Sequence, residues 1–306
     1  MLRNKKVSIV MNCYNGAKYL NEAIESVIHQ TYKNWELIFY DNCSTDESAK
    51  IIKKYVNKKI KYFKSKKKIN LGLARHKAFE KCKGSYIAFL DCDDLWFKEK
   101  LSSQLELFKD KEVGIVISNS IIFNKKRAKR LYFKRPPEGK VFYDLIKNYY
   151  ISLDTVILRK DSLKKLDKYF QSKFNIIHDL DLLTRLSFFT KLAYYPKALS
   201  KWRVHNLSDS YNKDKKINKE KKVFINEISK KFKNDKKFKI AKKKFLNELE
   251  YNKLLNLLIS GKKKFLLNKL LNLQTNFKKL ILIFFLIFPY GSFFLKRIYE
   301  FRKFYD

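Results

Sequence analysis

YIAFLDCDD, residues 86–94, is the segment on which the other features of this chain depend. Its first five residues are apolar and rich in β-formers, so Tyr86–Leu90 predicts a buried strand. Carboxylates follow at three of the next four positions, Asp91, Asp93 and Asp94. Open α/β sheets bind their ligands at the carboxyl ends of the strands, so these acids lie where a ligand is expected.

The two acids Asp91 and Asp93 favour a divalent cation. Carboxylates two positions apart at the end of a strand repel each other unless a cation compensates them. Oxygen ligands indicate Mg²⁺ or Mn²⁺, which also bind substrate phosphates. The alternative is that Asp93 or Asp94 begins a helix over Leu95–Phe108 as an N-cap, and the segment by itself leaves both interpretations open.

Length and charge limit the function classes. The 306 residues form one large domain or two modest ones, and the formal net charge of +39 favours polyanionic partners. The abundance of Lys, Asn, Ile, Phe and Tyr is also typical of an AT-rich coding sequence. Because no stretch alternates basic and aromatic residues in the pattern of RNA-binding segments, we expect no nucleic-acid function.

The cysteines and the N-terminus indicate a cytosolic protein. The four cysteines form no CxxC pair, and no histidine is spaced to complete a zinc site. The first residues, Met1–Lys6, are charged and run directly into a strand, so we expect no secretory signal. Reduced thiols in the cytosol fit this pattern best.

Strands and helices alternate in the N-terminal half of the chain. Apolar runs predict strands at Val7–Met11, Glu36–Tyr40, Ile60–Phe63, Tyr86–Leu90, Val113–Ser118 and Leu153–Leu158. Helical spacing predicts the intervening helices, one begun by the capping box Ser44–Glu47 and another over Leu73–Cys82. This βαβ repeat predicts a parallel sheet, and right-handed crossovers place Asn12–Asn15, Asp41 and Asp91–Asp94 along one edge.

Five motifs follow one another in a recognisable order. They read VSIVMNCYN (7–15), HQT (29–31), ELIFYDNCSTD (36–46), NLGLAR (70–75) and GSYIAFLDCDD (84–94). Together they resemble the family 2 glycosyltransferases, closely over about residues 5–110 and weakly to about residue 210. The resemblance implies the GT-A nucleotide-sugar fold, an α/β architecture whose mostly parallel twisted, Rossmann-like sheet is flanked by helices. A C-terminal helical region follows it.

The resemblance also implies a donor site. It assigns the nucleotide to Asn12, Tyr14, Asn15, Asp41, Asn70, Arg75 and Asp91. In this assignment Tyr14 stacks on the base and Asp41 accepts a hydrogen bond from it. Arg75 lies near the base or the phosphates.

The DxD motif of the family corresponds to Asp91 and Asp93. The resemblance makes Asp93 the direct ligand of a Mn²⁺ or Mg²⁺ ion that bridges the donor diphosphate. The chain departs from the family at Asn42, where a second acid is usual, and at Cys43, where glycine is usual. UDP remains the favoured nucleotide.

A second acidic segment carries the predicted catalytic base. In the family an acidic pair precedes a helix that ends in Arg-Leu, and here the pair reads His178-Asp179, so Asp179 corresponds to the base. An inverting transfer needs a carboxylate that accepts the proton of the acceptor hydroxyl as that oxygen attacks C1. Asp181 is the second candidate, as a base or an acceptor contact. The alternative is that both acids stabilise a helix N-terminus.

An aromatic and basic segment closes the first domain. The family often has aromatic-Arg-x-His here, and this chain has Lys201–His205, KWRVH. The resemblance implies that His205 approaches the metal or the diphosphate and that Arg203 pairs with phosphate. A histidine of no special role is the alternative. The expected catalytic domain therefore covers residues 1–210.

Residues 211–306 differ in composition from the rest, with Lys-rich helical segments and one uncharged stretch, Leu280–Leu295. A membrane-spanning helix needs about twenty apolar residues, and Pro289 and Gly291 interrupt this shorter stretch. With cationic flanks it predicts an interfacial anchor on an anionic membrane surface. A helix buried against the first domain and a homodimer through this region are the alternatives.

These observations predict an inverting, metal-dependent glycosyltransferase that moves a hexosyl or N-acetylhexosaminyl group from a nucleotide-diphosphate donor. The expected acceptor is a hydroxyl of a growing surface polysaccharide, lipooligosaccharide or other lipid-linked glycan. The expected location is peripheral, on the cytoplasmic face of the cell membrane. The alternatives are a nucleotidyltransferase, whose Gly- and Arg-rich loop is missing from Asn12–Asn15, and a non-catalytic basic protein that binds membranes or nucleic acid.

Overall fold

The computed structural model divides the chain into two compact units. The described residues are 5–205, 214–260, 277–288, 292–295 and 297. The units are Met1–Leu145 with Tyr149–His205, and Ile146–Asn148 with Asn206–Asp306. The predicted boundary at residue 210 lies outside the described residues.

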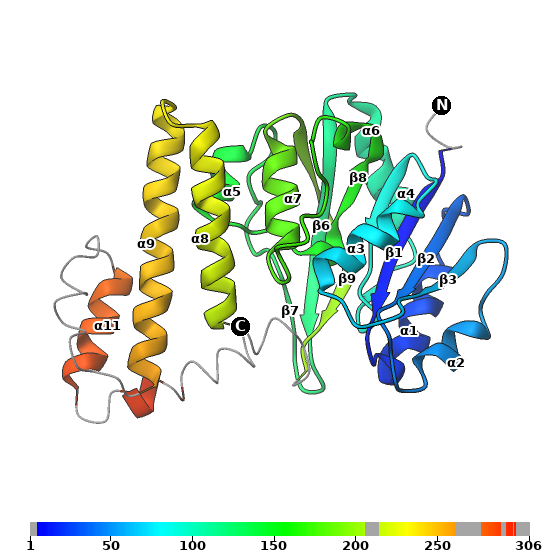
Figure 1. The fold of residues 1–306 in the computed structure, drawn as a ribbon, viewed down its shortest axis with the longest axis horizontal. Helices are drawn as coiled ribbons and strands as arrows, with labels where there is room; N and C mark the ends of the chain where they lie inside the picture. Colours follow the sequence, from blue (N-terminus) through cyan, green and yellow to red (C-terminus); the bar gives the residue numbers. More distant parts are fainter. Residues whose placement is uncertain (1–4, 206–213, 261–276, 289–291, 296, 298–306) are drawn as a thin grey trace. The chain divides into compact units, whose positions relative to one another are not determined.

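The first unit is built on one nine-stranded sheet with the order β3-β2-β1-β4-β8-β6-β9-β5, and β7 pairs with β6 (Figure 1). The strands are β1 Val7–Cys13, β2 Trp35–Asp41, β3 Ile60–Lys64, β4 Tyr86–Phe89, β5 Leu95–Trp96, β6 Val113–Phe123, β7 Ala128–Arg130, β8 Ile157–Arg159 and β9 Lys191–Arg203. Strands β1 to β4 pair in parallel, as the sequence predicts. Strand β8 is antiparallel to both of its neighbours, so the remainder of the sheet is mixed. The predicted α/β class is confirmed.

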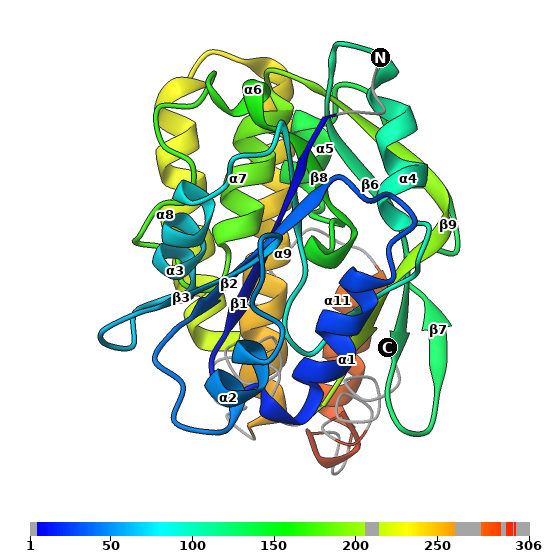
Figure 2. The same cartoon turned by 90° about the vertical axis from the view of Figure 1, so that its right-hand side faces the viewer.

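Helices cover both faces of the parallel strands. They are α1 Ala17–Ile28, α2 Ser48–Lys53, α3 Leu71–Glu80, α4 Lys100–Leu105, α5 Phe142–Lys147, α6 Lys160–Leu163 and α7 His178–Ser187. Figure 2 shows α3 and α7 on one side of β1 and α1 and α4 on the other. Alternate residues of β1 serve the two layers, because Ile9 and Met11 pack with α1 whereas Val10 packs with α3. Burying each such side chain contributes roughly 1.5–3 kcal/mol, which fixes where the strand ends lie.

Three local predictions are wrong. Leu95–Phe108 is not one helix, because Leu95 and Trp96 form β5 against β9 and α4 begins only at Lys100. An N-cap role for Asp93 or Asp94 is therefore excluded for that helix. A 3₁₀ turn, Glu106–Lys109, follows α4.

The expected capping box at Ser44–Glu47 is also absent, since α2 begins at Ser48 with no side-chain cap at Glu47. Asp46 accepts from the Ser48 amide instead, at 3.0 Å. The predicted strand Leu153–Leu158 is a 3₁₀ turn, Leu153–Thr155, followed by β8.

The second unit is helical, with α8 Asp214–Lys231, α9 Lys236–Ile259 and α11 Phe277–Ile287. Leu282 of α11 packs against Leu254 and Leu258 of α9. Part of the predicted anchor, residues 289–291, lies outside the described residues. None of the helices in the described part of the chain is both long enough and apolar enough to cross a membrane.

Candidate active site

The parallel strand β4 delivers the DxD acids to the edge of the sheet. The Leu90 amide still donates to the Val10 carbonyl at 3.1 Å, so the segment stays aligned with β1 up to that residue. The chain then turns, with the Asp94 amide donating to the Asp91 carbonyl. The Asp91 side chain is 43% exposed and pairs with Arg75 at 2.5 Å, whereas Arg75 itself is buried. A buried guanidinium thus faces an acid that remains open to solvent.

The second DxD acid meets a histidine from the other end of the domain. Oδ2 of Asp93 lies 2.8 Å from Nε2 of His205, and both side chains are partly exposed. The carboxylate oxygen suits Mn²⁺ or Mg²⁺, and an imidazole nitrogen beside it favours the transition metal Mn²⁺. In the described part of the chain, no three His, Cys, Asp or Glu side chains gather to hold a metal by themselves. A cation between Asp93 and His205 would therefore take its other ligands from substrate phosphates and water.

Arg203 and Asp94 stabilise the turn that carries these acids. The Arg203 amide donates to Asp94 Oδ1 at 2.8 Å, and its Nε donates to the Asp93 carbonyl at 2.8 Å. Its Nη2 pairs with Glu22 at 2.7 Å, and its guanidinium lies 4.3 Å from the Tyr19 ring centroid. Burial, together with the charge of Asp93, raises the pKa of Asp94 well above its ordinary value. The phosphate contact of Arg203 stays a prediction.

The loop after β1 approaches the same edge. Asn15 has φ of 54°, a left-handed conformation that asparagine tolerates, and its Oδ1 accepts from the Thr45 amide at 2.8 Å. Tyr14 is 43% exposed, and Nζ of Lys68 lies 3.5 Å from its ring centroid. Stacking of Tyr14 on a base stays a prediction.

Asn12 lies under this loop. Although it is only 6% exposed, neither atom of its amide has a hydrogen-bond partner in the described part of the chain. A buried amide without a partner is costly, and a polar ligand group would satisfy it.

Asp41 is fully buried rather than open to a base. Its Oδ1 accepts from the Ser44 amide at 2.7 Å, and its Oδ2 accepts from the Tyr62 hydroxyl at 3.0 Å. Burial, with the adjoining Asp41 carboxylate, raises the pKa of Tyr62 to about 12. Asn70 has a similar structural role, because its side chain caps α3 by accepting from the Leu73 amide at 2.8 Å. The base contact of Asp41 and the nucleotide contact of Asn70 stay predictions.

The candidate base Asp179 lies in the first turn of α7. Its side chain is 20% exposed, and Oδ2 accepts from the Tyr149 hydroxyl at 3.0 Å. Burial alone would raise the pKa of Asp179, but the hydrogen bond from His178 and the charge of Arg75 outweigh it and hold the pKa below its ordinary value. The carboxylate is therefore ionised at neutral pH.

Asp181, two residues further along α7, has partners of its own. It is buried and pairs with Arg185 at 2.6 Å, and Gln171 donates to both of its oxygens. Of the two acids, Asp179 is the accessible one and Asp181 stabilises the helix. No sequence motif marks Tyr149 or Glu22, since each reaches the site through a contact distant in the chain.

An open α/β sheet binds its ligand at the carboxyl ends of its strands, and here that edge carries a DxD turn, an acid–imidazole pair and a separate, partly exposed carboxylate. This arrangement fits the GT-A class of nucleotide-sugar transferases. The sequence model of the family described as Glycosyl transferase family 2 matches residues 8–167. The chain belongs to this family and is a glycosyltransferase.

Curated relatives agree with this assignment. The chain is 31% identical over 212 residues to the putative teichuronic acid biosynthesis glycosyltransferase TuaG of Bacillus subtilis (strain 168), covering 68% of this chain and 82% of that protein. It is 32% identical over 217 residues to WfaP of Escherichia coli, covering 71% and 84%. WfaP is named a UDP-Glc:alpha-D-GlcNAc-diphosphoundecaprenol beta-1,3-glucosyltransferase.

Solved structures show the same fold. S. aureus TarS 1-349 in complex with UDP-GlcNAc aligns with a TM-score of 0.65 at 19% identity, covering 98% of this chain and 93% of that chain. The mannosyltransferase PcManGT from Pyrobaculum calidifontis, in complex with GDP-Man and Mn²⁺, aligns with a TM-score of 0.61 at 15% identity, covering 98% and 86%. The predicted family, GT-A fold and enzyme class are confirmed.

Proposed function

We propose that this enzyme transfers a sugar from a UDP-sugar, with inversion and with a divalent cation, to a hydroxyl of a lipid-linked surface glycan. The observation that carries the proposal is the convergence of Asp91, Asp93 and His205 on one sheet edge, with Asp179 connected to the same edge through Arg75. The relatives named for teichuronic acid and for diphosphoundecaprenol-linked glucosyl transfer support the acceptor class. The UDP-GlcNAc complex of TarS supports the nucleotide.

The residues divide the reaction between them. Asp93 and His205 would hold the cation, which when bound offsets the charge that develops on the leaving diphosphate. Asp179 accepts the proton of the acceptor hydroxyl while that oxygen bonds to C1 of the sugar and the bond from C1 to the diphosphate oxygen breaks. Because base and leaving group lie on opposite faces of the sugar in such a displacement, the product has the inverted configuration. The nucleoside diphosphate leaves with the electron pair of the broken bond.

A thermal-shift screen of nucleotides with and without Mn²⁺ tests the donor. A ligand that binds only the folded state raises the free energy of unfolding, by about 2.7 kcal/mol at a hundredfold excess over Kd. Tm rises accordingly. We expect the largest shift with UDP or a UDP-sugar plus Mn²⁺. No shift with any nucleotide would favour a non-catalytic binding protein, and transfer of nucleoside monophosphate would favour a nucleotidyltransferase. Asp93→Ala and Asp179→Ala must each abolish sugar transfer.

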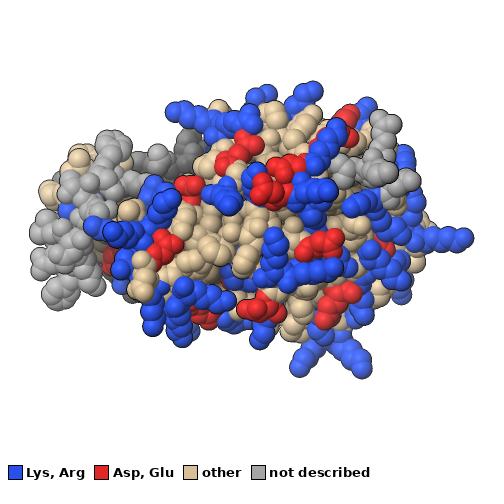
Figure 3. Space-filling model, turned by 90° about the horizontal axis from the view of Figure 1, so that it is seen from above, with Lys and Arg blue, Asp and Glu red and all other residues tan. Residues whose placement is uncertain are grey.

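We further propose that the second unit binds an anionic membrane surface, where a lipid-linked acceptor resides. Three apolar side chains of α11, Leu280, Phe284 and Ile287, are exposed at the spacing of one helix face. The same helical unit is basic, with six lysines among residues 236–244 at the start of α9. Lys and Arg lie at many places on the described part of the surface shown in Figure 3, with Asp, Glu and uncharged surface between them. The exposed apolar face of α11, in a basic unit, suits the boundary between lipid head groups and acyl chains.

Vesicle partition tests the membrane proposal. Phe284→Asp with Ile287→Asp should abolish cosedimentation with phosphatidylglycerol vesicles, because two charges then lie on the apolar face. The matched control is Ile240→Asp, at a residue of α9 that is 67% exposed. If both proteins bind vesicles equally, α11 is not the anchor. A change from dimer to monomer in solution, with no change in vesicle binding, would instead identify the face as a homodimer interface.

A further inference from the structure

A continuous chain of buried contacts joins the DxD turn to the candidate base. Arg75, on α3, donates from Nη2 to Asp91 at 2.5 Å and from Nη1 to Nε2 of His178. The other ring nitrogen of His178, Nδ1, lies 3.4 Å from Oδ1 of Asp179. Tyr149 completes the chain by donating to Oδ2 of Asp179. The chain of contacts thus runs from the DxD turn through Arg75 to His178, and His178 and Tyr149 both contact the Asp179 carboxylate.

The histidine in this chain has more hydrogen-bond donors around it than its ring can accept. A guanidinium can only donate, and it faces Nε2, while the backbone amide of Asp179 can only donate, and it faces Nδ1 at 2.8 Å. A neutral imidazole has one nitrogen lone pair for accepting and one N–H. The two donors therefore compete, and the winner decides which nitrogen of His178 carries the proton.

The charged donor wins this competition. Hydrogen bonds from an ionised group are roughly twice as strong as neutral ones, and a guanidinium facing an N–H in a buried site would be strongly repelled. The Asp179 amide belongs to the first turn of α7, where amides have no partner within the helix in any case. With Nε2 accepting from Arg75, the proton of His178 lies on Nδ1 and faces the Asp179 carboxylate.

We propose that Arg75 holds His178 in the Nδ1–H tautomer and that His178 is a positioning residue, which orients the Asp179 carboxylate towards the acceptor. Nδ1–H then faces Oδ1 of Asp179 at 3.4 Å, while the Tyr149 hydroxyl donates to Oδ2. This inference rests on the proposed role of Asp179 as the base.

The residue type at position 178 has an electrostatic consequence. The family resemblance gives an acid at this position, and an acid beside Asp179 would disfavour a second negative charge there. The buried neutral ring of His178 leaves Asp179 as the one carboxylate at this end of the chain of contacts, while Asp91 pairs with Arg75 at the other end. The lowered pKa of Asp179 agrees with this arrangement.

Nitrogen-15 NMR of histidine-labelled protein tests the tautomer without any need for turnover. The two neutral tautomers differ widely in their ring nitrogen shifts. We expect the His178 signal, assigned by its loss in His178→Gln, to report Nδ1–H in the wild type and to move towards Nε2–H in Arg75→Met. The signals of His29 and His76 serve as internal controls. An Nε2–H tautomer in the wild type would overturn the proposal, and this outcome does not depend on Arg75→Met folding.

Kinetics then separate positioning from mere packing. Removing the donor in His178→Ala should lower kcat roughly 10–100-fold, leave the donor KM unchanged and move the acidic limb of the kcat profile to higher pH, since the pKa of Asp179 rises. His178→Gln, whose amide both accepts and donates, should restore most of kcat. An equal loss at every pH with no rescue by Gln would overturn the positioning role. Absence of sugar transfer by the wild type would contradict the proposed function instead, and the NMR result would still stand.

Discussion

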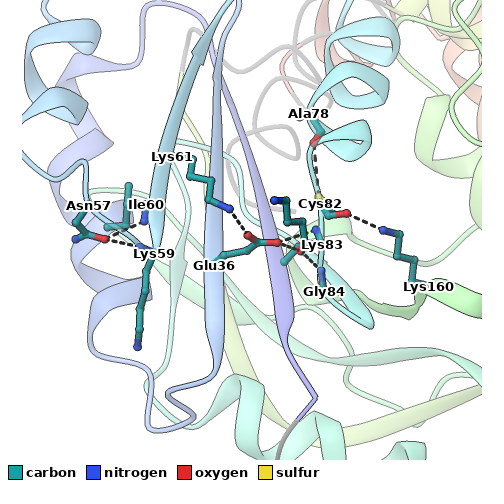
Figure 4. Close-up of polar contacts among 11 residues, drawn as sticks. Glu36, Asn57, Lys59, Ile60, Lys61, Ala78, Cys82, Lys83, Gly84 and Lys160 are labelled. Atoms are coloured by element: carbon teal, nitrogen blue, oxygen red, sulfur yellow. Dashed lines mark hydrogen bonds and ion pairs between the residues drawn. The ribbon is translucent and has the colours of Figure 1, made fainter.

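The two ends of the parallel strands treat buried polar groups in opposite ways. At the amino end, Glu36 of β2 is buried, and every one of its bonds is made within the protein (Figure 4). Its Oε1 accepts from the Ser8 hydroxyl at 2.6 Å and from the Lys83 amide at 2.7 Å, and its Oε2 accepts from Lys61 at 2.7 Å. These bonds fasten β1, β2 and β3 to the turn before β4.

At the carboxyl end of the same strands the polar groups are left partly open. Asp91 and Asp93 keep solvent-exposed surface, and Asn12 has an amide with no partner among the described residues. A satisfied buried network makes a fold rigid, whereas unsatisfied groups raise its free energy until a ligand binds them. Favourable free energy of ligand binding is therefore expected at the carboxyl end of the strands, and the following substitutions test this expectation.

The largest expected effect on kcat distinguishes Asp179 from Asp181, two acids in the same helical turn of α7. Asp179→Asn should lower kcat by about 10³-fold or more, because an amide cannot accept the acceptor proton, and should leave Tm within about 2 °C. Asp181→Asn should instead lower stability by about 3 kcal/mol, because it disrupts a buried ion pair, while the folded enzyme keeps its kcat. Steady-state kinetics and thermal unfolding of both variants check this. Comparable losses of kcat in the two would contradict the assignment of Asp179 as base.

The second prediction concerns the cation. His205→Ala should weaken activation by Mn²⁺ roughly 10–100-fold, because the carboxylate of Asp93 loses its partner ligand. Without nucleotide, the Tm of wild type and variant should respond little to Mn²⁺, since two side chains hold a cation weakly. Titration of activity with Mn²⁺ measures the effect, with the exposed His29→Ala as the control. Equal Mn²⁺ dependence in all three proteins would place the cation elsewhere.

The sequence predicted what is local or repeated, and missed what depends on distant contacts. The runs at Val7, Trp35 and Tyr86 are strands because alternate side chains enter two helical layers, and that pattern is visible in the sequence. Leu95–Trp96 became a strand instead of a helix because β9, about a hundred residues later, pairs with it. No local pattern carries such information, since tertiary pairing overrides propensity.

The site divides in the same way. Motifs mark Asp93 and Asp179, and both side chains are partly exposed, while their roles stay predictions. No motif predicts the burial of Asp41, because it depends on Tyr62 of the neighbouring strand, whose hydroxyl donates to Oδ2 of Asp41. Tyr149 and Gln171 decide which acid of α7 stays accessible, and neither lies in any motif.

The amino end of the strands should respond to substitution in stability alone. Glu36→Gln should cost about 2 kcal/mol, because charge-assisted bonds from Lys61 and two other donors become neutral ones, while kcat stays unchanged. Burial raises the pKa of Glu36, but the bonds from Lys61, Ser8 and the Lys83 amide outweigh it, so the pKa lies below its ordinary value of 4.5. A lowered folded pKa means that this stabilisation is complete above about pH 5 and is lost as pH falls below 4.5. Unfolding curves of wild type and variant should therefore converge at acid pH, and a constant gap would contradict the role of the charge.

The smallest effect is expected where a polar group has no partner. Asn12→Ala should change stability by less than about 1 kcal/mol, because the lost packing is offset by removing a buried amide that makes no hydrogen bond. Affinity for UDP should nevertheless fall about tenfold, the value of one good hydrogen bond. Ser8→Ala at the opposite end is the matched control, since it removes bonds to Glu36 and to the Gly84 amide and should lower Tm without weakening UDP binding. If Asn12→Ala instead destabilises the free protein as much as Ser8→Ala does, the side-chain amide of Asn12 already makes stabilising contacts without a ligand. The two ends of the strands would then not differ in how they satisfy buried polar groups.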